Sequence, residues 1–228
     1  MKITIDAGHV KGYNVGVDTR YNEGLMAWTL SKLLGAELEK YGAQVFYTRD
    51  DIAKDLALES RGKTAHDNGS ELFISLHSDG FTSPTARGVS VFYSNYRKLD
   101  SAGIANDLGI AVAALIGTPF RGAMTRLYGG AYPQADYYGV IRGAVGYSGE
   151  RSPRAALLIE HGFHSNPNDC AWLLREDNLK KLAETEAALI ARFYGLQKTE
   201  ASAPPDPQGK YTALLADIEA VIKKHKGA

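Results

Sequence analysis

A single-domain α/β fold with a largely parallel sheet is predicted by three features of this sequence. Apolar runs rich in strand-forming residues recur at residues 3–5, 72–76 and 156–158. Segments with helical spacing separate these runs, and such alternation favours parallel pairing of the strands. The chain has 228 residues, 44% of them hydrophobic, which suits one domain with a full core.

The first helix is predicted to begin at Glu23. Its apolar stripe consists of Met26, Leu30, Leu33, Leu34 and Leu38. Glu23 heads this stripe, so its carboxylate belongs to the buried side of the helix. An ionised group there is costly unless it is paired or bound to a metal. Gly42 is a suitable stop signal for this helix.

The later elements are predicted from alternation, helical spacing and glycine or proline stops. They are a strand at 45–48, a helix at 56–68, a strand at 88–93 and helices at 101–117, from Pro167 onward and at 179–194. Residues 120–153 are rich in glycine and tyrosine and show no clean period, so an irregular stretch is expected there. The single cysteine, Cys170, is predicted to be a small core residue.

Composition divides the chain into three parts. Residues 1–196 form the predicted domain, and residues 197–209, rich in proline and alanine, form a linker. Residues 210–228 carry their apolar side chains on one stripe, which predicts a short amphipathic helix. A lone helix of this length is marginal in water, so it is expected to dock on the domain, pair with another copy or lead into a further module.

The composition also excludes several classes of protein. A formal net charge of zero argues against nucleic acid as the main partner. No apolar run approaches the ~18 residues of a membrane span. Residues 1–6 enter a strand directly, so no signal peptide is expected.

Four polar residues mark a candidate site. His9, His77 and Glu160 lie just past the carboxyl ends of predicted strands, which in an open α/β sheet line one ligand-binding edge. Two imidazoles and the Glu23 carboxylate are the ligands of a catalytic zinc site with an open fourth position. Glu160 is then a carboxylate that does not bind the metal and can transfer protons. Each residue alone favours a structural role, and only the joint pattern indicates a metal site.

Seven sequence blocks in order resemble the zinc-dependent N-acetylmuramoyl-L-alanine amidases of the amidase-3 type, found in bacterial autolysins and phage endolysins. The blocks are Ile5-Asp6-Ala7-Gly8-His9, Asn22-Glu23, Thr48-Arg49, Arg61 with Ala65, Phe73-Ile74-Ser75-Leu76-His77, Gly88-Val89, and Ile159-Glu160 with Gly162-Phe163 and Ser165-Asn166. The resemblance spans residues 2–195. It implies a twisted, mixed sheet with helices on both faces.

The resemblance also implies a function. One Zn²⁺ ion is expected on His9, Glu23 and His77, with Glu160 as the catalytic glutamate. The expected substrate is peptidoglycan, cut at the amide between N-acetylmuramic acid and L-alanine. Without a leader, the expected route is that of an endolysin, made in the host cytoplasm and acting on the cell wall. The tail helix could pair with another copy or lead to a wall-binding module.

Four more residues are candidates for supporting roles. Arg142 could pair with a stem-peptide carboxylate, and Tyr128 could stack on sugar or peptide or simply fill a loop. His164 lies in a loop near the site and could touch substrate. Asp79 could orient a ligand histidine through a hydrogen bond, or cap a loop.

Two structural roles and two rival functions complete the expectations. His161 points away from Glu160 in a strand, which favours a packing or hydrogen-bonding role. Arg49 and Arg61 are expected in structural ion pairs. The metal ligands do not determine which acyl group the substrate carries, so a zinc peptidase or another amidohydrolase is one rival. A non-catalytic wall-binding module on the same scaffold is the other.

Overall fold

The computed structural model describes residues 1–151 and 153–198, together with positions 216, 220 and 223. A six-stranded sheet is built from β1 (Lys2–Ala7), β2 (Gln44–Tyr47), β3 (Leu72–Asp79), β4 (Val89–Tyr93), β5 (Phe120–Met124) and β8 (Ala155–Phe163). The main helices are α1 (Glu23–Glu39), α2 (Leu58–Asp67), α3 (Lys98–Ile116), α4 (Gly139–Val145), α5 (Pro167–Leu173) and α6 (Glu176–Tyr194). A separate hairpin pairs β6 (Leu127–Gly129) with β7 (Tyr132–Asp136), and a short 3-10 turn spans Asn95–Arg97.

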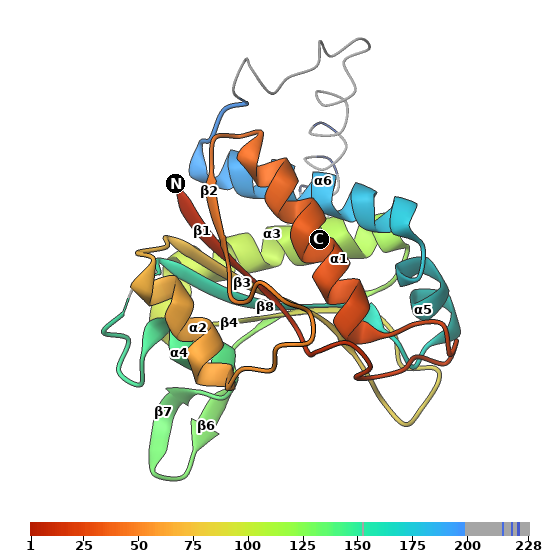
Figure 1. The fold of residues 1–228 in the computed structure, drawn as a ribbon, viewed down its shortest axis with the longest axis horizontal. Coiled ribbons are helices and arrows are strands. Elements are labelled where there is room, and N and C mark those ends of the chain that lie inside the picture. The colour runs from red at the N-terminus through yellow and green to blue at the C-terminus, as the bar shows by residue number, and fades with distance from the viewer. Residues whose placement is uncertain (152, 199–215, 217–219, 221–222, 224–228) are drawn as a thin grey trace.

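Helices cover both faces of the sheet (Figure 1). Helices α1, α3 and α6 lie on one face, and α2 and α4 lie on the other. The strand order is β2-β1-β3-β8-β4-β5, and every neighbouring pair is parallel except β8 with β4. The predicted α/β class, with a mostly parallel mixed sheet, is therefore confirmed.

The two faces of the sheet differ in chemistry. Along β1, Ile3 and Ile5 point into the large core under α1, α3 and α6. Thr4 and Asp6 alternate with them and point to the α2 side, because successive strand side chains emerge on opposite faces. A smaller apolar core on that side is centred on Phe73. Polar side chains thus gather on the α2 side, near the carboxyl ends of β1 and β3.

Several boundaries differ from the sequence-based expectations. The stretch 120–153 is not irregular, because it contains β5, β6, β7 and α4. Its strands have only three to five residues, and the β6–β7 hairpin is largely exposed. The sequence there therefore shows no regular alternation of apolar and polar residues. Helices α3 and α6 each begin three residues earlier than expected, since their first turns are partly polar.

The remaining expectations have mixed outcomes. Cys170 is buried and free, as predicted. No helix in the described part of the chain is both long and apolar enough to cross a membrane. The expected linker at 197–209 lies outside the described residues except for positions 197 and 198. The expected tail helix at 210–228 lies outside them except for positions 216, 220 and 223.

Candidate metal centre

His9 follows β1 in an unusual backbone conformation. Its φ is +51°, in the left-handed region that residues other than glycine seldom adopt. Arg49 holds this turn, since its Nη2 donates to the His9 carbonyl oxygen. The His9 ring stacks on Tyr13, with 5.9 Å between centroids. Burial is the main cause that lowers the His9 pKa, partly opposed by the charge of Glu23.

Glu23 begins α1 and is almost fully buried, at 1% exposure. Asn22 caps the helix by accepting the Leu25 amide at 3.0 Å. The Glu23 carboxylate accepts the Asn14 side-chain amide at 2.6 Å and the Ser78 backbone amide at 3.0 Å. Burial alone raises the pKa of Glu23, but the hydrogen bond and charge of His77 outweigh it, so the pKa is lowered to about 2.

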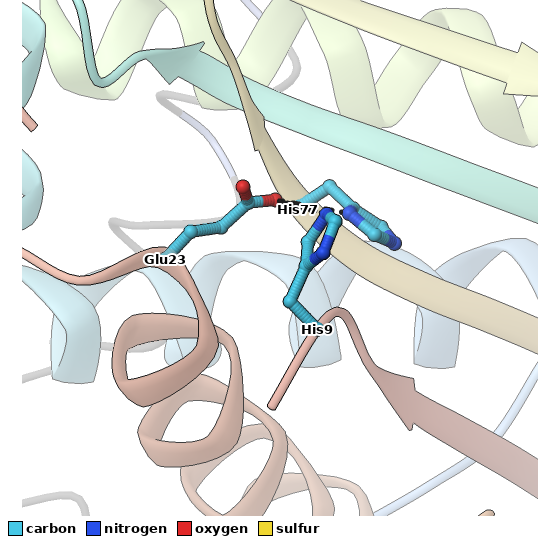
Figure 2. Close-up of side chains that lie close together, drawn as sticks. All are labelled: His9, Glu23 and His77. Atoms are coloured by element: carbon cyan, nitrogen blue, oxygen red, sulfur yellow. Dashed lines mark hydrogen bonds and ion pairs between the residues drawn. The ribbon is translucent and has the colours of Figure 1, made fainter. Parts of the chain in front are cut away.

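His77, near the end of β3, completes the cluster. Its Nδ1 lies 3.0 Å from Glu23 Oε1, and His9 Nε2 lies 3.6 Å from the same oxygen. One potential ligand atom from each of the three residues lies within 4.8 Å of the others, and Figure 2 shows the side chains converging. The structure therefore brings the three expected zinc ligands together.

The donor set fits zinc. Two imidazole nitrogens and one carboxylate oxygen match its preferred ligands, and three protein ligands leave a position open for chemistry. The chain also leaves room for the His77 ring. A Cβ on Gly8 would lie 2.4 Å from His77 Cε1 and 2.6 Å from the Leu76 carbonyl oxygen. Only glycine permits this approach of β1 to β3.

Gly8→Ala is expected to displace the His77 ring and weaken zinc binding. The added methyl group overlaps both His77 and a backbone oxygen, and overpacking of this kind costs about 1–3 kcal/mol. Zinc competition with a chromophoric chelator and urea denaturation measure the two effects. Gly103→Ala is the control, because its Cβ would lie no closer than 3.3 Å to Phe193. Wild-type zinc affinity in Gly8→Ala would contradict the expectation.

Glu160 lies beside the cluster on β8. It is paired in register with His77, so both side chains emerge on the same face of the sheet. Its Oε2 is buried and makes no hydrogen bond within the described part of the chain. Burial is the main cause that raises the Glu160 pKa to about 8, and the charges of Glu23 and Asp79 add to it. An unpaired carboxylate next to the candidate ligands is thus available for proton transfer.

The metal-free protein is expected to lose stability as the pH rises from 4.5 to about 8. In that window the folded chain keeps the Glu160 proton that the unfolded chain has released, so the free energy of unfolding falls with pH. Glu160→Gln should remove this part of the pH dependence. Thermal unfolding of both metal-stripped proteins across the window measures it, and equal slopes would refute the assignment.

Comparison with known proteins fits this geometry. Residues 3–192 match the family model described as N-acetylmuramoyl-L-alanine amidase. The chain belongs to this amidase family. A stretch of 102 residues is 34% identical to the amidase AmiA of Salmonella typhimurium and 33% identical to that of Escherichia coli, covering 44% of this chain but only 35% of either relative. The uncharacterized protein YqiI of Bacillus subtilis is 26% identical over 192 residues, 84% of each chain.

Solved structures show the same amidase fold. The catalytic domain of CwlV from Bacillus (Paenibacillus) polymyxa var. colistinus is 24% identical, with a TM-score of 0.69 over 86% of this chain and 99% of that one. AmiC2 of Nostoc punctiforme is 21% identical, with a TM-score of 0.68 over 86% of this chain and 97% of that one.

Two of the supporting residues of this amidase chain lie close to the cluster. His164 Nδ1 is 3.0 Å from Ser78 Oγ and 4.0 Å from Glu23 Oε2, so His164 borders the Glu23 carboxylate. Asp79 Oδ1 accepts the Gly80 amide instead of orienting a histidine. Both ring nitrogens of His77 already have other partners, so the first alternative for Asp79, a hydrogen bond to His77, has no support, and its contact with Gly80 is in keeping with the second, a loop cap.

The other two supporting residues belong to the hairpin side of the fold. Tyr128 lies on β6, is 50% exposed and packs against the Arg142 guanidinium at 4.6 Å. Arg142 is mostly buried, and it donates to Glu59 and to the carbonyl oxygens of Asp136 and Tyr137. Its donors are therefore engaged within the chain, which leaves the expected pairing with a stem-peptide carboxylate without support.

The structural roles predicted for three residues are largely met. Arg61 forms a buried ion pair with Asp6 at 2.8 Å. Arg49 binds the His9 carbonyl instead of a carboxylate, so the expectation of an ion pair was wrong for it. His161 is fully buried and bridges the His77 carbonyl oxygen and Glu186, as a hydrogen-bonding role requires.

Sequence reasoning missed the polar support of the site. Asp6, Ser75 and Ser78 are buried beside the ligands, yet none was singled out. Asp6 and Ser75 had a signal, because each is a polar residue inside an otherwise apolar strand. Asn14, which contacts Glu23, lies in a loop and carries no such signal.

Proposed function

We propose that this chain is a zinc-dependent N-acetylmuramoyl-L-alanine amidase that hydrolyses peptidoglycan and so degrades the cell wall. The bond cut is the amide between N-acetylmuramic acid and the L-alanine of the stem peptide. The observation that carries the proposal is the convergence of His9, Glu23 and His77 beside the unpaired carboxylate of Glu160. Membership of the amidase family supports the choice of bond.

The three ligands and Glu160 divide the chemistry. Zinc held by His9, Glu23 and His77 would supply a Lewis acid for the scissile carbonyl and acidify a water molecule. Glu160 accepts the proton of the attacking water and delivers it to the amide nitrogen as the carbon–nitrogen bond breaks. The products are a free lactyl carboxylate and a free L-alanine amine.

The environment of Glu160 suits this proton transfer. Burial raises its pKa to about 8, so it takes a proton from water more readily than an exposed glutamate does. A positive charge beside a carboxyl group lowers its pKa, so Glu160 titrates closer to neutrality when a divalent cation is bound nearby. A general base works best when its pKa lies near the working pH.

Mass spectrometry of digested peptidoglycan tests the proposal. Purified peptidoglycan is incubated with the metal-stripped protein, with and without added zinc. Free stem peptides that begin with L-alanine, released only with zinc, are the expected products. Cleavage inside the stem peptide would instead support the zinc peptidase. Wall binding without cleavage by the folded, zinc-loaded protein would support the non-catalytic module.

A further inference from the structure

A buried hydrogen-bond chain connects His77 to the interior of the sheet. Asp6 is fully buried on β1, next to Ser75 of β3 in the parallel register. Ser75 Oγ lies 2.6 Å from Asp6 Oδ2 and 3.1 Å from His77 Nε2. On its other side, the His77 ring presents Nδ1 to Glu23 Oε1 at 3.0 Å. The chain Asp6–Ser75–His77 therefore ends at the candidate metal centre.

The direction of these hydrogen bonds is fixed at Asp6. Arg61 forms a two-pronged ion pair with its carboxylate, through Nε at 2.9 Å and Nη2 at 2.8 Å. Thr48 Oγ1 donates to the same carboxylate at 2.6 Å. A carboxylate paired with arginine is an acceptor, so Asp6 has no proton to give to Ser75. The single hydroxyl proton of Ser75 must point to Asp6.

This direction determines the proton on the histidine. Because Ser75 Oγ donates its only proton to Asp6, it can only accept a hydrogen bond from His77 Nε2. The Nε2 atom therefore keeps its proton. Nδ1 donates to Glu23 in the metal-free ring, and it is the nitrogen whose lone pair becomes available once that proton is lost. That lone pair lies on the side of Glu23, where the candidate ligands converge.

We infer that Ser75 is a positioning residue that selects the His77 tautomer able to bind the metal through Nδ1. Asp6, held by Arg61 and Thr48, sets the orientation of the Ser75 hydroxyl. The opposite tautomer would place a proton on Nδ1, between the ring and Glu23, and would block the ligand atom. Partners of this kind behind a metal ligand fix its orientation and raise its basicity. The inference rests on the proposed zinc site.

The test measures zinc affinity and the ring protons of His77 in the whole 228-residue chain. Ser75→Ala removes the hydroxyl, and Ser75→Thr restores one at the same position. Ser70→Ala is the matched control, because Ser70 is equally buried and its Oγ bonds Thr4 at 2.7 Å, away from His77. Competition with a chromophoric chelator gives the zinc Kd of each protein.

We expect Ser75→Ala to weaken zinc binding by about 10–100-fold, the usual effect of losing such a partner. Ser70→Ala should keep the wild-type Kd, and Ser75→Thr should recover part of the loss. In the zinc-loaded wild type, long-range proton–nitrogen NMR should find the His77 proton on Nε2, protected from exchange with solvent. That measurement needs no variant, so it tests the tautomer assignment even if a variant fails to fold.

The outcomes separate the two proposals. If the wild type binds zinc and Ser75→Ala binds it equally well, the positioning role is wrong while the zinc site stands. If NMR finds zinc on Nε2 and the proton on Nδ1, the tautomer assignment is wrong. If the folded wild type does not bind zinc at all, the proposed function fails and this inference fails with it.

Discussion

Glu160→Gln is expected to lower kcat for amide hydrolysis by about 10²–10⁴-fold, the usual contribution of a general acid–base group. Glutamine keeps the size of the side chain but cannot take a proton from water or return one to the leaving amine. Because Glu160 is not among the three clustered ligands, zinc binding should persist, weakened only by the loss of a neighbouring negative charge. Release of stem peptides gives kcat, and chelator competition gives the zinc Kd.

The control for this prediction is an exposed glutamate. Glu176→Gln changes the same functional group at the start of α6, where its only described ion pair is with Lys180 on the same helix. Its activity should match the wild type. A Glu160→Gln protein that retains most of its activity would exclude Glu160 as the proton carrier and would leave the site without a general base among the residues described above.

Glu23→Gln is expected to abolish both zinc binding and hydrolysis. Glu23 is the only charged ligand of the three, and its Oε1 lies near both histidines. An amide is a poorer zinc ligand than a carboxylate, and its NH₂ group would face donors already present at Asn14 or Ser78. Chelator competition and peptide release measure the losses.

The same substitution has a second, independent effect on stability. The pKa of Glu23 is lowered to about 2, so the metal-free wild type should lose stability as the pH falls from 4.5 to about 2. The stabilisation is fully present above 4.5, where the unfolded carboxyl group is already ionised. Glu23→Gln should lack this acid-dependent loss. Zinc binding by Glu23→Gln at wild-type affinity would place the metal elsewhere.

The sequence predicted those strands and helices in which one buried face repeats apolar residues at regular spacing. Residues 3–5, 72–76 and 156–158 are buried strands with continuous apolar faces, and the apolar stripe of α1 is buried at Met26 and Leu30. The β6–β7 hairpin escaped prediction because its exposed strands bury almost nothing. Local patterns thus reveal an element only when one of its faces is packed.

In the candidate site, likewise, some residues could be predicted from local sequence patterns and others could not. His9, Glu23 and His77 were predictable, since each is a polar residue at the boundary of a patterned element. Their supporting hydrogen bonds were not, because the partners lie far apart in sequence. Asp6 meets Ser75 across 69 positions, a pairing that only the strand register determines. Asp79 was one candidate for orienting a histidine because it is close in sequence to His77, whereas the side chain bonded to the His77 ring is Ser75.

The left-handed turn at His9 determines how the site would choose among ions. The Arg49 contact to the His9 carbonyl holds the backbone at positive φ, so the ring can adapt to a different coordination shell only through its side-chain torsions. Larger cations such as calcium need six to eight oxygen ligands at longer distances, which a cluster of two imidazoles and one carboxylate does not offer. Selectivity would then come from backbone stiffness as much as from the identity of the ligands.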